Sequence, residues 1–237
     1  VKERRAEAVA EFREPQTVGR RFQTLLHTTP AMVPLIVLTA SVLLFGIVVG
    51  GRFFSAATLT LILQQVQIVG IVAAAQTLVI LTAGIDLSVG AVAVLTSVVM
   101  GFFIFRYGVP VAVAIPAGLA LGALLGFVNG WLVAVMKLPP FIVTLGTWQI
   151  FLASNFLYSA NETIRAQDIE AEAPALQFFS STFKIGADET GRGGATFTYG
   201  VIFMILLIAV LAYALRSTAW GRHVYAVGDD PDAAQLL

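Results

Sequence analysis

The sequence predicts an all-α fold, a polytopic bundle of membrane-spanning helices, on three observations. First, 58% of the 237 residues are hydrophobic and only 12% are charged, whereas soluble domains carry about a quarter charged residues. Second, the apolar residues fall into six long segments, each near the ~20 residues that a helix needs to cross a bilayer. Third, lipid offers the backbone no hydrogen-bond partners, and long unbroken apolar runs satisfy it as helices.

The six expected spans divide the chain into three regions. They cover residues 31–50, 57–81, 87–105, 109–136, 141–158 and 197–215. Residues 1–30 form an N-terminal segment, residues 31–215 the transmembrane domain with an outer loop at about 160–196, and residues 216–237 a C-terminal segment. Within the first segment, residues 17–27 place apolar side chains at helical spacing with arginines between them, which predicts a short helix on the membrane surface.

The basic residues predict the orientation. An even number of spans puts both ends of the chain on one side of the membrane. That side carries Lys2, Arg4, Arg5, Arg13, Arg20, Arg21, Lys137, Arg216 and Arg222, against Arg52, Arg106, Arg165, Lys184 and Arg192 on the other side. Because lysine and arginine are enriched in cytoplasmic loops, the N-terminus is expected in the cytoplasm.

The stretch GIDLSVG joins the second and third expected spans and contains a single carboxylate, Asp86. Gly84 suits the end of the preceding helix, where φ is positive, and Asp86 suits the N-cap of the next helix. A second interpretation is that such a break lines a path, since ionisable residues at membrane depth are functional by default. The two interpretations are compatible.

Uncharged polar side chains are sparse in the spans and give candidates for a substrate path. Amides and hydroxyls suit a neutral polyol better than an ion, although hydrogen bonding between helices is an equally ordinary role for them. With Asp86, the candidates are Gln65, Gln76, Asn129, Thr144 and Thr147.

The fourth expected span carries glycines four residues apart. Glycines at this spacing clear one face of a helix, so another helix can approach closely. The expected packing residues are Gly118, Gly122, Gly126 and Gly130.

Several functions are excluded by missing motifs. There is no GxxxxGK[ST] loop, which a phosphate-cradling ATP site requires. There is no cysteine, the histidines His27 and His223 lie far apart, and the net charge is zero. We therefore expect no hydrolytic activity, metal site, cofactor or nucleic-acid partner.

In the C-terminal segment the sequence predicts a short helix, and the sequence ends within that helix. Asp230 and Pro231 read as an N-cap and a first helical residue, and only six residues follow Pro231. We expect a longer natural chain.

Three stretches together resemble the membrane permeases of bacterial ABC importers for simple sugars, the ribose, xylose and fructose group. They are LVILTAGIDLSVGAV (78–92), GFVNGWLVAVMKLPPFIVTLGT (126–147) and TAWGRHVYAVGDDPDAAQL (218–236). The resemblance covers residues 31–237. It implies about ten spans, of which six are present, in the bacterial inner membrane.

The resemblance also implies partners. Such permeases work in pairs, here implying a homodimer, on cytoplasmic ATP-binding subunits, with a periplasmic sugar-binding protein delivering the substrate. The third stretch would be the segment that couples to the ATPase, through Gly221, Arg222, Tyr225, Gly228, Asp230, Pro231, Ala233 and Ala234. Where the family has Gly-Gly-Asn-Pro-like residues, this chain has an aspartate at 229 and at 230.

Two other transport functions stay open. A secondary transporter or channel would want ionisable residues at mid-membrane, and Asp86 is the one carboxylate in residues 31–158, which contain the first five expected spans. An ABC importer for amino acids or nucleosides would share the same general architecture.

Overall fold

The structure is a computed structural model that describes residues 28–29, 31–186 and 195–234. The expected surface helix at 17–27 and part of the outer loop lie outside the described residues. The chain divides into two units, residues 1–58 and 59–237, which are taken separately below.

The described part of the first unit, from residue 28 on, contains one long apolar helix. Helix α2 spans Met32–Val49, and a 3-10 turn, η1, follows at Gly50–Arg52. Gly50 takes a positive φ of 69° at the helix end, a conformation that glycine adopts at little cost. Helix α3 begins at Ala56. The hydroxyl of Ser55, the residue before it, accepts a 3.2 Å hydrogen bond from the Thr58 amide.

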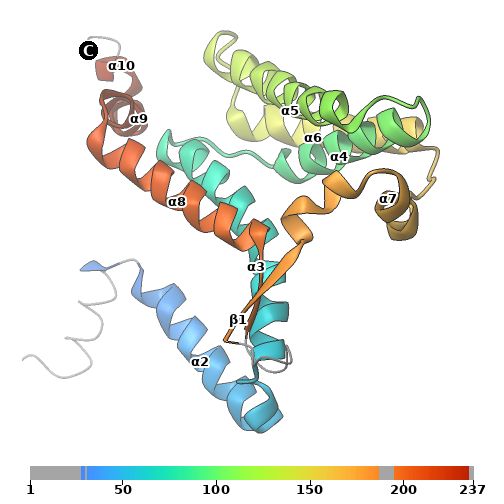
Figure 1. Ribbon diagram of the computed structural model, residues 1–237. Coiled ribbons are helices and arrows are strands. Elements are labelled where there is room, and N and C mark those ends of the chain that lie inside the picture. Colours follow the sequence, from blue (N-terminus) through green and yellow to red (C-terminus); the bar gives the residue numbers. More distant parts are fainter. Residues whose placement is uncertain (1–27, 30, 187–194, 235–237) are drawn as a thin grey trace, which may run out of the picture. The chain divides into compact units, whose positions relative to one another are not determined.

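The second unit is built from apolar helices and a short subdomain between α6 and α8, here called the α7–β2 subdomain (Figure 1). Its long helices are α3 (Ala56–Leu81, continuing from the first unit), α4 (Val89–Phe105), α5 (Val111–Ala134), α6 (Pro140–Ser159) and α8 (Tyr199–Ser217). After α8 come α9 (Ala219–Asp229) and α10 (Pro231–Ala234).

The helices match the expected spans, with one short of the usual spanning length. Five helices among the described residues are long and apolar enough to cross a membrane, and α4, with 17 residues, is slightly shorter. The third expected span began at Leu87, whereas α4 begins at Val89 because the GIDLS stretch stays non-helical. The sixth began at 197, whereas α8 begins at Tyr199 because residues 195–198 form a strand.

The loop between α6 and α8 contains structure that the sequence did not predict. It holds α7 (Ala166–Glu172), a 3-10 helix η2 (Pro174–Ser180), and an antiparallel hairpin of β1 (Thr182–Ile185) and β2 (Ala195–Thr198). Thr182 pairs with Thr198, and Phe183 with Phe197. The fold is thus helical with one two-stranded ribbon.

Helices α4, α5 and α6 pack against one another (Figure 1). Ala91 and Leu95 of α4 form a buried cluster with Phe151 of α6. A second cluster joins Ile104 of α4, Ala114 of α5 and Ala173 beside η2. The α7–β2 subdomain therefore covers one end of this three-helix group.

The hairpin is attached to α3 and leads into α8. The Thr60 hydroxyl donates to the Thr196 carbonyl at 2.8 Å and accepts from the Thr196 amide at 3.2 Å. Thr198 caps α8 by accepting from the Val201 amide, and its hydroxyl also bonds the Gln67 side chain. Polar side chains of α3 thereby hold the entry to α8.

Candidate functional site

The break between α3 and α4 is the centre of the candidate site. Helix α3 ends in a Schellman motif, in which the Gly84 amide donates to the Val79 carbonyl at 2.9 Å and the Ala83 amide to the Ile80 carbonyl at 3.0 Å. The residue with positive φ is Ala83, at 56°. The expectation that Gly84 takes this position is wrong. A Cβ on Gly84 would lie 3.1 Å from the Val79 carbonyl oxygen, a tight contact.

Asp86 shapes the non-helical stretch through its carboxylate. Oδ1 accepts 2.7 Å hydrogen bonds from both the amide and the hydroxyl of Ser88. The N-cap of α4 is Ser88, not Asp86 as expected, since α4 begins at Val89. The carboxylate therefore acts two residues before the N-cap, in an aspartate turn that holds the buried Ser88.

Side chains from three helices hold this stretch in place. Gln76 of α3 donates from Nε2 to the Asp86 carbonyl at 3.0 Å. Asn129 of α5 donates from Nδ2 to the Ser88 hydroxyl at 2.8 Å, with both residues buried. The Thr144 hydroxyl of α6 is within hydrogen-bond distance of two acceptors, the Ile85 carbonyl at 3.1 Å and the Pro140 carbonyl at 2.9 Å.

The structure thus brings together four of the six candidate path residues. Thr147 is a fifth, buried one turn along α6 and bonded to the Thr144 carbonyl at 3.4 Å. Gln65 stands apart, with an exposed side chain, whereas its neighbour Gln67 bonds Thr198. Sequence reasoning missed Ser88, the fully buried residue that links Asp86 to Asn129; its place two residues after Asp86 was the available signal.

The four glycines of α5 do not share one face. Gly118 and Gly122 face α4, where added Cβ atoms would lie 3.3 Å from Met100 Cβ and 3.4 Å from Thr96 Cγ2. Gly126 and Gly130 have no such neighbours within 4 Å among the described residues. Four residues turn a helix by about 400°, so a line of glycines four apart drifts by about 40° at each step.

The C-terminal segment divides into an inner and an outer face. Gly221, Val224 and Gly228 of α9 are buried or half-buried, on the side that meets the rest of the unit. A Cβ on Gly221 would lie 2.6 Å from the Ala214 carbonyl oxygen of α8, and one on Gly228 would collide with the Leu81 carbonyl oxygen of α3.

The other residues expected to contact an ATPase lie outside this inner face. The side chains of Arg222 and Tyr225 are exposed, as are Asp230 and Pro231. Helix α10 begins at Pro231, the predicted position, and the Ala234 amide donates to the Asp230 carbonyl at 3.0 Å. Ala234 is half-buried, and the side chain of Ala233 lies outside the described ones.

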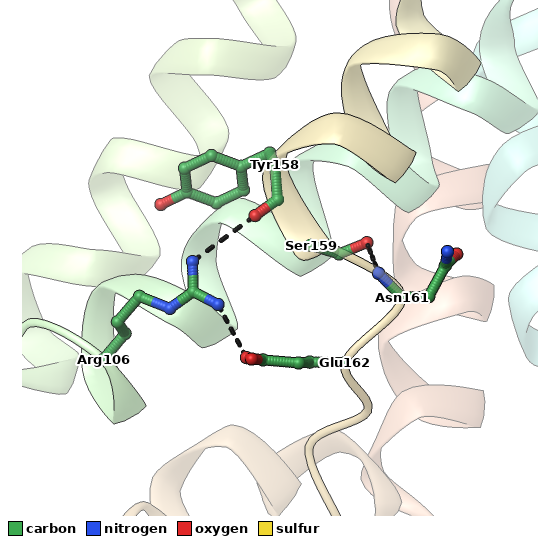
Figure 2. A network of polar contacts seen from close by, with 5 residues as sticks. All are labelled: Arg106, Tyr158, Ser159, Asn161 and Glu162. Carbon is green, nitrogen blue, oxygen red and sulfur yellow. Dashed lines mark hydrogen bonds and ion pairs between the residues drawn. The ribbon is translucent and has the colours of Figure 1, made fainter.

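The opposite end of α4 carries a charged contact with the loop after α6 (Figure 2). Arg106 Nη2 lies 2.6 Å from Glu162 Oε2, and Nη1 lies 3.5 Å from the Tyr158 carbonyl oxygen. The guanidinium also stands 4.4 Å from the centre of the Phe102 ring. The hydrogen bond with Glu162 is the main cause that raises the pKa of Arg106. The ion pair links the end of α4 to the loop that follows α6.

Comparison with known proteins places the chain in a transport family. Residues 58–237 match the family described as branched-chain amino acid transport system / permease component. The chain belongs to this permease family. No solved structure matches it.

Individual relatives are importer permeases. The chain is 66% identical over 221 residues to the fructose import permease protein FrcC of Rhizobium meliloti, covering 93% of this chain and 59% of that protein. It is 33% identical to the autoinducer 2 import system permease protein LsrC of Escherichia coli K12, over 78% of this chain and 50% of that protein. LsrC of Photorhabdus luminescens is also 33% identical, over 84% and 56%. The chain therefore spans between half and three-fifths of the length of these relatives.

Proposed function

We propose that the complete protein is the translocation subunit of an ATP-driven importer that carries fructose, or a closely similar monosaccharide such as ribose or xylose, across the bacterial inner membrane. The observation that carries this proposal is the 66% identity to a fructose import permease over 93% of the chain. The break between α3 and α4 supports it, because the groups that hold the break are neutral amides and hydroxyls apart from Asp86.

The mechanism is alternating access, with no covalent chemistry on this chain. Two cytoplasmic ATP-binding subunits close on ATP and displace the C-terminal segments of two permease copies. Arg222 and Tyr225 on the exposed face of α9, with Asp230 and Pro231 beside them, would meet these subunits. A periplasmic sugar-binding protein would release the sugar at the opposite face, and the N-terminus would lie in the cytoplasm with α9.

Substrate would pass the α3–α4 break. Gln76, Asn129, Thr144 and Thr147 line this region from three helices, and a sugar hydroxyl can exchange hydrogen bonds with amides and hydroxyls of this kind. Asp86 is already engaged by Ser88, so its charge serves the shape of the turn. This arrangement favours a neutral substrate over proton coupling.

The test is reconstitution of the full-length protein with its ATP-binding subunit and sugar-binding protein in vesicles. Uptake of labelled fructose should require ATP, and excess unlabelled fructose should compete with it more effectively than leucine or a nucleoside. Uptake driven by an ion gradient without ATP would instead support a secondary transporter. Preferential uptake of leucine would support the amino-acid branch of the family.

A further inference from the structure

The inner face of α9 touches the end of α3 so closely that no side chain fits between them. A Cβ on Gly228 would collide with the Leu81 carbonyl oxygen, and it would lie 3.0 Å from the Leu81 carbonyl carbon and 3.5 Å from Thr82 Cα. The atoms in its way belong to the backbone, so they cannot rotate aside as a flexible side chain would. We refer to this as the Gly228–Leu81 contact (the α9 and α3 ends are shown in Figure 1).

The same piece of backbone leads directly into the break. Leu81 is the last residue of α3, and the Schellman bonds of Ala83 and Gly84 fold the chain back from there. The Thr82 hydroxyl adds a 3.0 Å bond to the Val79 carbonyl. Since the Asp86 carbonyl is tied back to α3 through Gln76, the short connection from Leu81 to Asp86 has little freedom to move independently of the helix end.

We propose that Gly228 is a positioning residue for transport: the Gly228–Leu81 contact passes displacement of α9 to the α3 end and so to the Asp86–Ser88 stretch. This inference rests on the function proposed above and adds the route inside the permease. Arg222 and Tyr225 lie on the exposed side of α9, about 120° and about 60° away from Gly228 around the helix axis. The exposed side of α9 would therefore receive the push from the ATPase, and the buried side at Gly228 would deliver it.

A glycine suits this role for a steric reason. Displacement is passed without loss only where two rigid elements are in direct contact, because packed interiors transmit strain instead of absorbing it. Backbone against backbone is the closest contact that two elements can make. A methyl group at position 228 would hold α9 away from α3 or tilt it.

The decisive variant is Gly228→Ala in the full-length permease, assembled with its ATP-binding subunits and binding protein. Alanine is a better helix former than glycine, so a defect cannot come from weakening α9. We expect ATP hydrolysis to continue while sugar uptake per ATP hydrolysed falls at least about fivefold, the lower end of ordinary coupling factors between sites. The matched control is Gly130→Ala, since a Cβ there meets nothing within 4 Å among the described residues.

A second readout separates coupling from stability. Ile85, next to Asp86, is 52% exposed, and the 237 residues contain no cysteine, so Ile85→Cys supplies a single thiol in this part of the protein. Its labelling rate should change when the assembled complex is trapped with ATP and vanadate. Adding Gly228→Ala should abolish this change, and adding Gly130→Ala should preserve it. A full change together with normal uptake per ATP in Gly228→Ala would overturn the proposal.

Should Gly228→Ala fail to assemble, two single-cysteine proteins with Gly228 intact decide the matter. Thr82→Cys lies beside Gly228 and Ile85→Cys lies beside Asp86, and both thiols should change their labelling rate on trapping. A change at position 82 with none at position 85 would contradict the proposal. If the unaltered complex showed no ATP-dependent uptake, the proposed function itself would be contradicted. Equal behaviour of Gly228→Ala and Gly130→Ala would instead contradict only the proposed role of Gly228.

Discussion

At the scale of single residues, Ser88 is the central hydrogen-bonding residue of the break between α3 and α4. Its hydroxyl donates to Asp86 and accepts from Asn129, and the residue is fully buried. Asn129 Oδ1 has no hydrogen-bond partner among the described residues, so the Ser88 bond is what anchors this amide. Removing one partner of a buried polar pair costs more than removing both.

Ser88→Ala should therefore destabilise the protein by about 1–3 kcal/mol, because it leaves the Asn129 amide buried without its acceptor. Thermal unfolding of the purified protein in detergent measures this. The double variant Ser88→Ala, Asn129→Leu should cost less than the sum of the single changes. The control is Ser97→Ala, whose exposed hydroxyl bonds only its own helix. Strict additivity in the double variant would argue against the buried pair.

Asp86→Asn tests whether the carboxylate serves shape or charge. Asparagine keeps an oxygen that can accept from the Ser88 amide, so uptake by the reconstituted complex should stay within about tenfold of the unaltered protein, the effect of ~1.4 kcal/mol. Asp86→Leu removes the acceptor and should abolish uptake. Equal loss in both variants would mean that the charge itself is required.

Sequence reasoning found most of this cluster and missed its geometry. Asp86, Asn129 and Thr144 stand out because polar residues are rare in apolar runs. Whether Ala83 or Gly84 takes the left-handed conformation depends on the residue at which α3 stops, which no local propensity fixes. The choice between Gln65 and Gln67 likewise depends on which face of α3 meets Thr198, a tertiary contact.

At the scale of elements, α5 shows how a helix presents only part of a regular pattern to its neighbour. Ala114, Gly118 and Asn129 are its buried residues. Positions 118 and 129 are eleven apart, about three whole turns, so they lie on the same face of α5. The glycines, spaced four apart, move progressively away from that face. The close approach of α5 to α4 is thus confined to the first two glycines of the series.

Gly118→Val should destabilise the helix group by about 1–3 kcal/mol, the usual cost of overpacking a tight interface. The equivalent change Gly126→Val should cost little, because nothing lies within 4 Å of its Cβ position among the described residues. Thermal unfolding of the two variants side by side is the measurement. A larger loss from Gly126→Val would place the tight face of α5 elsewhere.

The exposed face of α9 gives a separate prediction. Arg222→Glu reverses a charge on the surface proposed to meet the ATP-binding subunit, so it should separate ATP hydrolysis from uptake without unfolding the protein. Co-purification of the subunit and uptake per ATP report the effect. Arg165→Glu, an equally exposed arginine at the start of α7, is the control. Normal coupling in Arg222→Glu would remove this face from the proposed interface.

The hairpin escaped prediction for a physical reason. Each strand has only four residues, the lower limit at which an alternating pattern can be recognised. The ribbon is held by ring contacts, with Phe183 stacked on Phe197 at 5.9 Å and near Tyr199 at 5.5 Å. Such pairing between distant positions cannot be read from local composition.

At the scale of the whole molecule, the apolar segments fixed the class of protein before any contact was known. Length and hydropathy suffice because lipid imposes helices on any spanning segment. The placement of helix ends, the α7–β2 subdomain and the packing partners depended on tertiary contacts. Orientation rests on the distribution of lysine and arginine and is open to direct test.

Two single-cysteine variants test that orientation. Helix α5 has 24 residues, about 36 Å at 1.5 Å per residue, so its two ends should lie on opposite sides of the membrane. Tyr107→Cys, before α5, should react with an impermeant thiol reagent from the periplasm, and Met136→Cys, after α5, only once the membrane is opened. Both positions are more than half exposed. The reverse pattern would invert the topology.

The hairpin bonds from Thr60 and Gln67 and the α9 contacts at Gly221 and Gly228 fasten α3 and α8 together at both extremities. Two helices fastened in this way cannot open to solvent one at a time. Their amide protons should accordingly exchange with deuterium in concert, as one cooperative unit, and loosening either extremity should raise the exchange rate along both.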